Sequence, residues 1–318
     1  MNATNLDSAM RAWLEGSDLG ELHTIELLRD RPWSRVWYVT GAGGTGYFKA
    51  PGPGGRQEAP LLRWLAGCFA DHLPPIIRLD EARGWSLTAP AGTLLRQLPD
   101  VGTQHAILQQ FLPIYANLQR DSISALAELA ALGLPDRQPA RLPELLAELL
   151  ASPHGQAIPD ELRARCRAAL PRLAEVCAQL AAAPYAIALE HGDLHTNNIL
   201  INDGQIRLCD WGDANLSHPF FSLLPTFENL FPGLPAHVDD PAARALRDAY
   251  LAPWQDLAPA PQLEADFQQA LRTGYLLRAL DMAYQLIDAN EAELSRWRPF
   301  ISDSLARWLE SEARSTFP

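Results

Sequence analysis

The sequence is short of lysine, of paired cysteines and of long apolar runs. Lysine occurs once, at Lys49, although lysine and arginine together number 26. The four cysteines have no C-x-x-C spacing, so we expect reduced thiols in a cytoplasmic protein. No apolar run reaches the roughly 18–20 residues of a membrane span. The N-terminal residues lack the basic-then-apolar pattern of a signal peptide, and we expect no membrane partner.

Positive charge is scarce relative to negative charge. The formal net charge is −12 at pH 7, which disfavours nucleic acid and anionic membranes as partners and favours a cationic one. Charged residues make up 20% of the chain and apolar residues 47%, so we expect a folded core rather than disorder. At about 100–200 residues per domain, a chain of 318 residues forms about two units or one two-lobed unit.

The first quarter of the chain has the pattern of a small β-sheet. Residues 35–40 alternate and are rich in aromatic and β-branched side chains, and residues 47–50 read as the returning strand. An amphipathic helix is predicted over residues 57–68, with leucines on one side. Two more short strands are predicted over residues 76–79 and 85–88.

The glycine-rich residues 41–46 (GAGGTG) match the letters of a dinucleotide-binding fingerprint, G-x-G-x-x-G. That fingerprint follows a strand and opens a helix, whereas here a strand-like run comes next. The glycines are also too close to Lys49 for a protein-kinase glycine loop, which lies one strand earlier. We therefore predict a plain hairpin turn at this place.

Beyond residue 90 helical periodicity dominates, and only residues 191–211 interrupt it with strand-like pieces. We predict an α+β fold, with a nucleotide-binding β-rich lobe over residues 1–90 and a larger helical lobe over residues 91–318. Helices are predicted over residues 104–134, 141–151, 160–182, 242–251, 262–289 and 291–312.

The strongest chemical signal lies in residues 189–214, LEHGDLHTNNILINDGQIRLCDWGDA. Asp193 and Asn198 have the spacing of a kinase catalytic loop. Residues 199–201 and 205–209 read as a hairpin across an Asn-Asp-Gly turn, which returns Asp210 toward Asn198. Their two oxygens suit Mg²⁺, and Asp193 is placed to accept a hydroxyl proton. The competing interpretation is an Asp- and Asn-rich loop that caps backbone groups.

These residues resemble the aminoglycoside phosphotransferase and choline kinase-like family, which are small-molecule kinases with the protein-kinase-like fold. The family loop H-G-D-x-x-x-x-N corresponds to His191 through Asn198, and its second metal aspartate to Asp210, before Trp211. The resemblance implies that Asp193 is the catalytic base, that Asn198 and Asp210 bind Mg²⁺, and that His191 supports the loop. It extends from about residue 27 to about residue 285.

The resemblance also implies a role for the single lysine. The family places a lysine on the third strand of the small lobe, where it pairs with a helix glutamate and contacts nucleotide phosphates. Lys49 ends such a strand, and Glu58 lies in the first turn of the predicted helix. A compact ammonium suits a phosphate contact better than a guanidinium fork does. The alternatives are a chance lysine, and a glutamate that only favours the helix N-terminus.

Two further nucleotide contacts follow from the same resemblance. The phosphate-covering turn falls at residues 29–34, where Ser34 is either a phosphate contact or an ordinary hairpin end. The linker between the lobes falls at residues 87–92, so the backbone of Thr88, Ala89 and Ala91 is expected to bind the adenine edge.

The chain departs from the family pattern at two places. Thr196 and Asn197 stand where the family often has Pro-Gly or a similar pair. Ser222 replaces an acid that in relatives braces the catalytic loop. Neither change removes a phosphate or metal ligand, but the second leaves the bracing of the loop open.

The function implied is an ATP- and Mg²⁺-dependent phosphotransferase that moves the γ-phosphoryl group to a hydroxyl of a small molecule. The alternative is a catalytically silent nucleotide-binding module acting through partners. Such a relative would be expected to have lost one or more of five side chains that are all present here, namely Lys49, Glu58, Asp193, Asn198 and Asp210. A protein kinase is disfavoured, because no HRD or DFG motif is present.

The acceptor is left open among aminoglycosides, choline, sugars, sugar amines and homoserine. The net charge and several acids of the helical lobe favour a cation, although such acids also occur on solvated helix faces and at caps. These acids are Glu228, Asp239, Asp240, Asp281 and Asp288.

Overall fold

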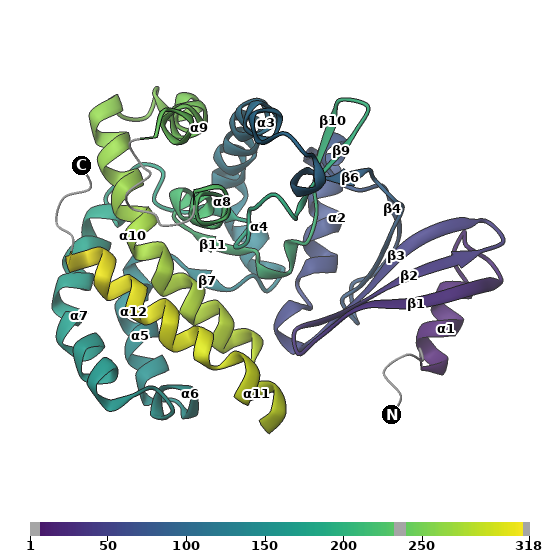
Figure 1. Ribbon diagram of the computed structural model, residues 1–318, viewed down its shortest axis with the longest axis horizontal. Coiled ribbons are helices and arrows are strands. Elements are labelled where there is room, and N and C mark those ends of the chain that lie inside the picture. The colour runs from purple at the N-terminus through teal and green to yellow at the C-terminus, as the bar shows by residue number, and fades with distance from the viewer. Residues whose placement is uncertain (1–6, 232–239, 314–318) are drawn as a thin grey trace.

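A five-stranded antiparallel sheet forms the N-terminal part of the computed structural model, which describes residues 7–231 and 240–313 (Figure 1). The strands lie in the order β1-β2-β3-β5-β4. The GAGGTG segment is the β2–β3 hairpin, in which Gly41 pairs with Gly44, as predicted. The strands are β1 (Leu22–Arg31), β2 (Ser34–Gly41), β3 (Gly44–Pro51), β4 (Ile76–Asp80) and β5 (Trp85–Thr88).

Two helices accompany this sheet. The predicted helix is α2 (Glu58–Cys68), and an additional helix, α1 (Ser8–Glu15), has no counterpart in the sequence prediction. Trp13 of α1 packs on Phe48 and Trp85, with ring centroids 5.6 and 5.7 Å apart. These contacts form a separate apolar core for the sheet.

The C-terminal part is mainly helical. Its helices α10 (Ala260–Gln285) and α12 (Pro299–Ala313) lie side by side in Figure 1. The segment predicted as one helix over residues 291–312 is two helices, because Pro299 has no N–H to continue the first one. Its helices are α3 (Val101–Ser122), α4 (Leu126–Ala131), α5 (Leu142–Ala151), α6 (Pro153–Gln156), α7 (Asp160–Ala181), α8 (Leu223–Leu230), α9 (Pro241–Leu251), α10 (Ala260–Gln285), α11 (Glu291–Trp297) and α12 (Pro299–Ala313).

Small sheets in the helical part carry the segment singled out in the sequence. β9 (Ile199–Asn202) and β10 (Gln205–Leu208) form the predicted hairpin, and β6 (Thr93–Leu94) pairs with β9. Its two-residue turn has Asp203 at φ 49° and Gly204 at φ 80°, as a type I′ turn requires. A third sheet joins β7 (Asp136–Arg137), β11 (Asn215–Ser217) and β8 (Ala188–Glu190).

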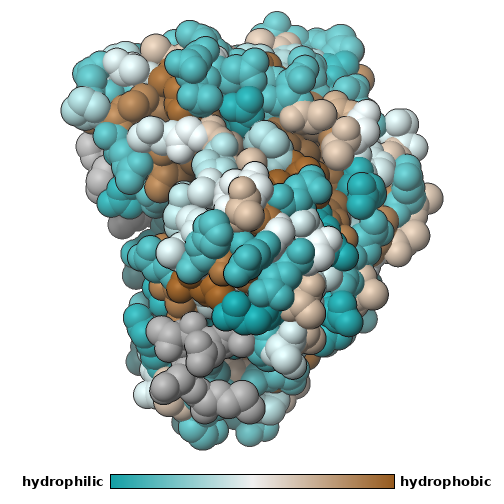
Figure 2. Space-filling model, turned by 90° about the vertical axis from the view of Figure 1, so that its right-hand side faces the viewer, coloured by the Kyte–Doolittle hydropathy of each residue, from teal (hydrophilic) through white to brown (hydrophobic). Residues whose placement is uncertain are grey.

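The architecture is the predicted two-lobed α+β fold, a small antiparallel sheet lobe beside a larger helical lobe. The boundary between residues 90 and 91 stays a prediction. Among the described helices, none combines the length and the hydropathy that crossing a bilayer requires. Figure 2 views the molecule from the sheet side, where hydrophobic patches are divided by hydrophilic side chains.

Candidate functional site

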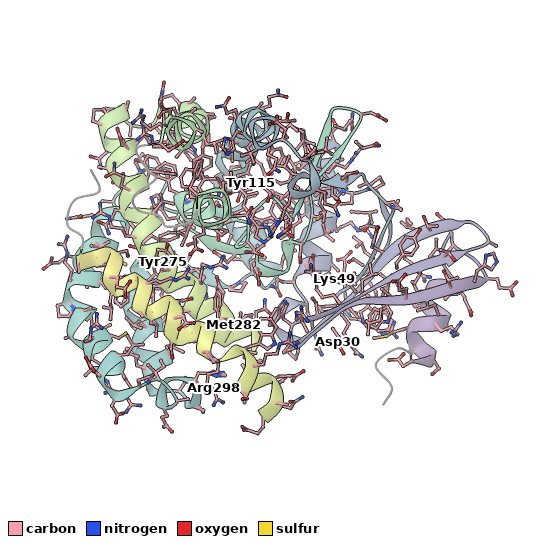
Figure 3. The ribbon with its side chains drawn as sticks, in the orientation of Figure 1. Asp30, Lys49, Tyr115, Tyr275, Met282 and Arg298 are labelled. Carbon is pink, nitrogen blue, oxygen red and sulfur yellow. The ribbon has the colours of Figure 1, made fainter. Side chains whose placement is uncertain are left out.

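A cluster of opposite charges joins the two lobes at Lys49. The Lys49 Nζ lies 2.6 Å from Glu58 Oε2 and also contacts Asp210 Oδ1. The Trp211 N–H donates to the other oxygen of Glu58 at 3.0 Å. On the more exposed side, Arg29 of β1 approaches Asp210 at 3.4 Å. In Figure 3 Lys49 lies where the sheet meets the helical lobe. The structure therefore brings Asp210 of the helical lobe to Lys49 and Glu58 of the sheet lobe, which lie more than 150 positions earlier in the sequence.

The charges of this cluster shift one another's pKa values. Burial alone would lower the pKa of Lys49, but the carboxylates of Asp210 and Glu58 raise it well above its ordinary value. Burial would raise the pKa of Asp210, but Lys49 and Arg29 outweigh burial and lower it. For Glu58 burial dominates over the lysine, and its pKa is raised. Lys49 is thus firmly cationic, and Asp210 firmly anionic.

Asp210 has a left-handed backbone, with φ 64° and ψ 63°. This region is sparsely populated by residues other than glycine, and it recurs at functional sites. The Cys209 N–H immediately before it donates to the Asn198 carbonyl at 2.9 Å. The hairpin thus returns Asp210 to the neighbourhood of Asn198, as predicted.

The loop between β8 and β9 holds Asp193 through two histidines. The Asn197 N–H donates to His195 Nδ1 at 3.1 Å, so Nδ1 is an acceptor and Nε2 is the ring nitrogen that carries a proton. This Nε2 lies 3.1 Å from Asp193 Oδ2 and donates to it. His191 accepts from the Asp193 N–H at 3.2 Å and contacts the Cys209 carbonyl at 3.1 Å. Each ring nitrogen of these histidines has a partner within the loop and the hairpin.

A glycine is required between the first histidine and Asp193. Gly192 has φ 81°, and a Cβ built on it would lie 2.2 Å from the Asp213 carbonyl oxygen. Any other residue would therefore displace the loop from the turn after β10. The H-G-D triplet is explained here by backbone conformation as well as by chemistry.

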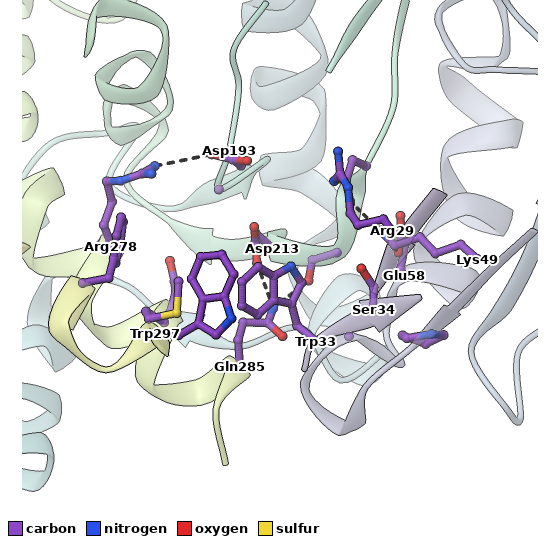
Figure 4. Close-up of a pocket in the computed structure, with 18 residues that line it drawn as sticks. Arg29, Trp33, Ser34, Lys49, Glu58, Asp193, Asp213, Arg278, Gln285 and Trp297 are labelled. Atoms are coloured by element: carbon purple, nitrogen blue, oxygen red, sulfur yellow. Dashed lines mark hydrogen bonds and ion pairs between the residues drawn. The ribbon is translucent and has the colours of Figure 1, made fainter. Parts of the chain in front are cut away.

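Arg278 of α10 contacts the other oxygen of Asp193. Its Nη1 lies 3.4 Å from Asp193 Oδ1 (Figure 4). Its Nε lies 3.7 Å from Glu228 Oε2. Burial would raise the pKa of Asp193, but the hydrogen bond from His195 and the nearby positive charges outweigh it. The pKa of Asp193 is therefore well below its usual range. The carboxylate is ionised, as a proton acceptor must be.

Asn198 and Asp210 are suited to a hard cation. The Asn198 Nδ2 donates to the Asp193 carbonyl at 2.9 Å, which leaves its amide oxygen for another partner. Asn198 and Asp210 line the same cavity, and oxygen donors of this kind are those that Mg²⁺ prefers. Within residues 7–231 and 240–313 no group of three His, Cys, Asp or Glu side chains forms a metal cage. A cation here would have few protein ligands, and oxygens of a bound phosphate would complete its coordination.

Two cavities meet at this cluster. The first, of about 440 Å³, is lined by Thr88, Ala89 and Ala91 and is called the linker chamber below. The second, of about 210 Å³, is lined by Ser34 and Asp193 and is called the loop chamber. The residues common to both linings are Arg29, Lys49, Glu58 and Asp210.

The loop chamber has aromatic walls from both lobes. Trp33, in the turn between β1 and β2, meets Trp297 of α11 edge to face, with centroids 4.8 Å apart (Figure 4). Phe300 and Met282 complete the apolar lining. A ligand in this chamber would therefore have flat apolar surfaces beside it as well as Asp193.

The polar end of the loop chamber has an unpaired acceptor. Gln285 is 7% exposed, and its Nε2 donates to Asp213 at 2.8 Å while its Oε1 has no partner. Burial and the charges of Asp193, Asp210 and Asp281 raise the pKa of Asp213 to about 8. A ligand that donates an N–H or O–H to the Gln285 oxygen would satisfy this buried acceptor.

The acids named from the sequence have different environments. Asp281 lines the loop chamber but is paired with Arg137 at 3.0 Å, and Glu228 is paired with Arg307 at 2.7 Å. Asp240 caps α9 by accepting from the Ala242 N–H at 2.7 Å, and Asp288 is exposed. Asp239 lies outside the described residues. Among the four described acids, Asp281 alone lines the chamber.

Sequence reasoning located the turn at residues 29–34 but singled out only Ser34 in it, and it missed three residues of the helical lobe altogether. Arg278, Gln285 and Trp297 come from two helices that are distant from the loop in sequence. Helical periodicity identifies α10 as buried, but it does not tell which of its polar residues face a cavity. Only the three-dimensional packing selects Arg278 and Gln285.

A two-lobed fold with a buried lysine–carboxylate cluster at the junction defines a protein-kinase-like phosphotransferase. The model of the phosphotransferase enzyme family matches residues 28–260, which is more than half of the chain. The chain therefore belongs to the phosphotransferase enzyme family. A comparison with curated protein sequences finds no match.

Solved structures share the whole fold at low sequence identity. The choline kinase LicA from Streptococcus pneumoniae has a TM-score of 0.63 at 14% identity, covering 96% of this chain and 99% of that one. The macrolide 2′-phosphotransferase MphH from Brachybacterium faecium has a TM-score of 0.58 at 20% identity, covering 93% and 98%. The ADP-bound aminoglycoside phosphotransferase APH(2″)-Ib has a TM-score of 0.62 at 16% identity, covering 96% and 99%. These likenesses establish the fold alone.

Proposed function

We propose that the protein is an ATP-dependent kinase that transfers the γ-phosphoryl group to a hydroxyl of a small molecule. The observation that carries the proposal is the position of Asp193, an ionised carboxylate that lines the loop chamber next to the wall shared with the linker chamber. A nucleotide in the linker chamber and an acceptor in the loop chamber would meet at that wall, beside Lys49 and Asp210.

The linker chamber suits a purine nucleotide. The Ala89 N–H already donates to the Pro75 carbonyl at 2.8 Å, so the adenine edge would use the Ala89 carbonyl and the Ala91 N–H. Thr88 would contribute to the wall beside the base. Relatives of the same fold have been solved with ADP, with ATP and with GDP, which supports nucleotide use in general.

The phosphates would lie at the shared wall. The Lys49 ammonium would bind them and Glu58 would hold it in place, while Ser34 at the start of β2 would contact the terminal phosphate. Asn198 and Asp210 would hold Mg²⁺, which when bound neutralises phosphate charge. The donor set is two hard oxygens beside a lysine, which fits that ion.

The transfer itself requires little covalent chemistry from the protein. The acceptor hydroxyl oxygen forms a bond to the γ-phosphorus, the bond from that phosphorus to the bridging oxygen breaks, and ADP leaves. Asp193 accepts the hydroxyl proton, while His195 and Arg278 keep its carboxylate ionised and oriented. Positioning and electrostatics account for most of the rate.

The acceptor would be a small hydroxylated molecule with additional N–H or O–H donors. Its hydroxyl would face Asp193, a donor would reach the Gln285 oxygen, and its flat or apolar part would lie against Trp33 and Trp297. The net charge of −12 favours an amine-bearing acceptor.

A screen for acceptor-dependent ATP consumption tests the proposal, with hydroxylated amines and sugars as candidates. We expect one class of acceptor to stimulate consumption by the wild type and not by Asp193→Ala. A matched control is Asp203→Asn, which changes an exposed turn acid and keeps a residue that tolerates positive φ. Tight MgATP binding with no acceptor-dependent turnover across the screen would instead favour a silent nucleotide-binding module.

A further inference from the structure

A buried carboxylate that lines neither chamber lies directly beneath the catalytic loop. Glu190 is the last residue of β8 and is 2% exposed. Its Oε1 accepts from the Ser222 hydroxyl at 3.0 Å, and its Oε2 accepts from the Asn215 amide at 2.8 Å. It also accepts from the Gly192 N–H, immediately before Asp193.

A chain of hydrogen bonds runs from the His191 N–H to the Glu190 carboxylate, and these two ends determine the direction of each bond between them. The His191 N–H donates to the Tyr115 hydroxyl at 3.0 Å, so the hydroxyl proton of Tyr115 is free to go to Ser222 Oγ at 2.8 Å. Ser222 Oγ receives a further bond from Gln119 at 3.2 Å, and its own proton goes to Glu190. The loop backbone, a tyrosine, a serine and the glutamate thus form one continuous network.

Keeping an acid in this place is costly. Burial raises the pKa of Glu190 to about 7, although the hydrogen bonds from Gly192, Asn215 and Ser222 oppose that rise. A neutral side chain would avoid the desolvation penalty. A carboxylate has two oxygens that both accept hydrogen bonds, and here they accept from side chains and from the loop backbone. A neutral amide has only one such oxygen and therefore accepts fewer bonds.

We propose that Glu190 is a positioning residue that fixes the backbone of residues 191–193, and with it Asp193. Ser222 stands where the family resemblance leads us to expect a bracing acid, and Glu190 lies on the other side of the same hydrogen bond as its acceptor. The effect on turnover rests on the proposed function, whereas the effect on the loop does not.

The first test replaces the acid with its isosteric amide, in Glu190→Gln. We expect kcat to fall by about ten- to a hundredfold, the order for a displaced catalytic group, with the KM for ATP changed less than about threefold. Amide hydrogen exchange in residues 191–194 should accelerate by tenfold or more, as about 1.4 kcal/mol of lost local stability implies.

The second test moves the acid to the other side of the network. Ser222→Asp in the wild type places two carboxylates in contact, and we expect lower stability and lower kcat. The same substitution combined with Glu190→Gln should restore both the slow exchange of the loop and most of the lost kcat. This reversal of sign between the two backgrounds is a coupling that a merely structural residue would not produce.

A matched control is Asp266→Asn. Asp266 is a buried acid at 7% exposure that accepts from the Tyr185 hydroxyl at 2.7 Å, away from the loop. Its replacement should lower the melting temperature and leave exchange in residues 191–194 unchanged. Should Glu190→Gln fold poorly, Ser222→Ala removes the same hydrogen bond with a smaller change and is expected to accelerate exchange in the same four residues.

Two results would overturn the inference. The first is unchanged loop exchange in both Glu190→Gln and Ser222→Ala. The second is an effect of Ser222→Asp that is the same in the wild type and in Glu190→Gln. Hydrogen exchange is measured on the apoprotein and needs no substrate. If no acceptor is ever phosphorylated, the proposed function fails while the exchange measurements still decide the role of Glu190.

Discussion

The replacement of Lys49 by arginine is the most informative single change, because the substitution keeps the charge and alters only its shape. The lysine is the sole one in the chain, and its ammonium lies between Glu58 at 2.6 Å and Asp210. The surroundings are tight: a Cβ built on Gly212 would lie 3.2 Å from Nζ. The wider guanidinium cannot occupy the position of a compact ammonium there.

The expected cost is that of one misaligned electrostatic contact to the transferring group. Loss of such a contact lowers kcat by about ten- to a thousandfold, or roughly 1.4–4 kcal/mol in the barrier. Stability should change little, because Lys49 borders both chambers, into which the displaced guanidinium can extend while its charge is retained. A change below about 1 kcal/mol would move the melting temperature by no more than about 4 °C.

The assay is steady-state turnover at varied ATP, with thermal unfolding measured in parallel. Arg29→Lys is the matched control, since Arg29 approaches the same carboxylate at 3.4 Å but its side chain is 49% exposed. Exposed pairs contribute about 0–1 kcal/mol, so this control should change kcat/KM by less than about fivefold. An unchanged kcat/KM for ATP in Lys49→Arg would refute the reasoning and make the single lysine a coincidence of composition.

Three other substitutions separate the parts of the site. Asp193→Asn should lower kcat by orders of magnitude with nearly normal ATP affinity, because Asp193 lines only the loop chamber; normal turnover would remove it as the base. Asp210→Ala should weaken MgATP binding at least tenfold by calorimetry, and an unchanged Kd would contradict a metal-binding role. Gln285→Leu should raise the KM of the acceptor by about five- to thirtyfold, the cost of one lost hydrogen bond, and leave the KM of ATP alone; the reverse pattern would place the acceptor elsewhere.

Local chemistry was the part of the site that could be predicted. The spacing of Asp193 and Asn198, the Asn-Asp-Gly turn and the position of Asp210 depend on neighbouring residues, and the structure has the predicted hairpin. Lys49 and Glu58 could be paired in advance because strand and helix follow one another directly. Whether each carries its expected role in catalysis stays a prediction.

The remaining parts depend on contacts between distant segments. Arg278 reaches Asp193 across 85 positions of sequence, and Glu190 meets Ser222 across 32. Periodicity reports which face of a helix is buried, not which cavity that face borders. The bracing of the loop was left open for the same reason, since the departure at Ser222 is visible in the sequence and its partner is not.

The shared wall between the two chambers bears on the order of events during turnover. Because the linings have only Arg29, Lys49, Glu58 and Asp210 in common, an occupant of one chamber does not fill the other. Both reactants can therefore be held at once, and no phosphorylated enzyme is needed to carry the group between them. Initial-rate plots at varied ATP and acceptor should intersect, and parallel lines would instead reveal a ping-pong route. The phosphoryl group would pass directly between two molecules bound at the same time, and the enzyme would never carry it covalently.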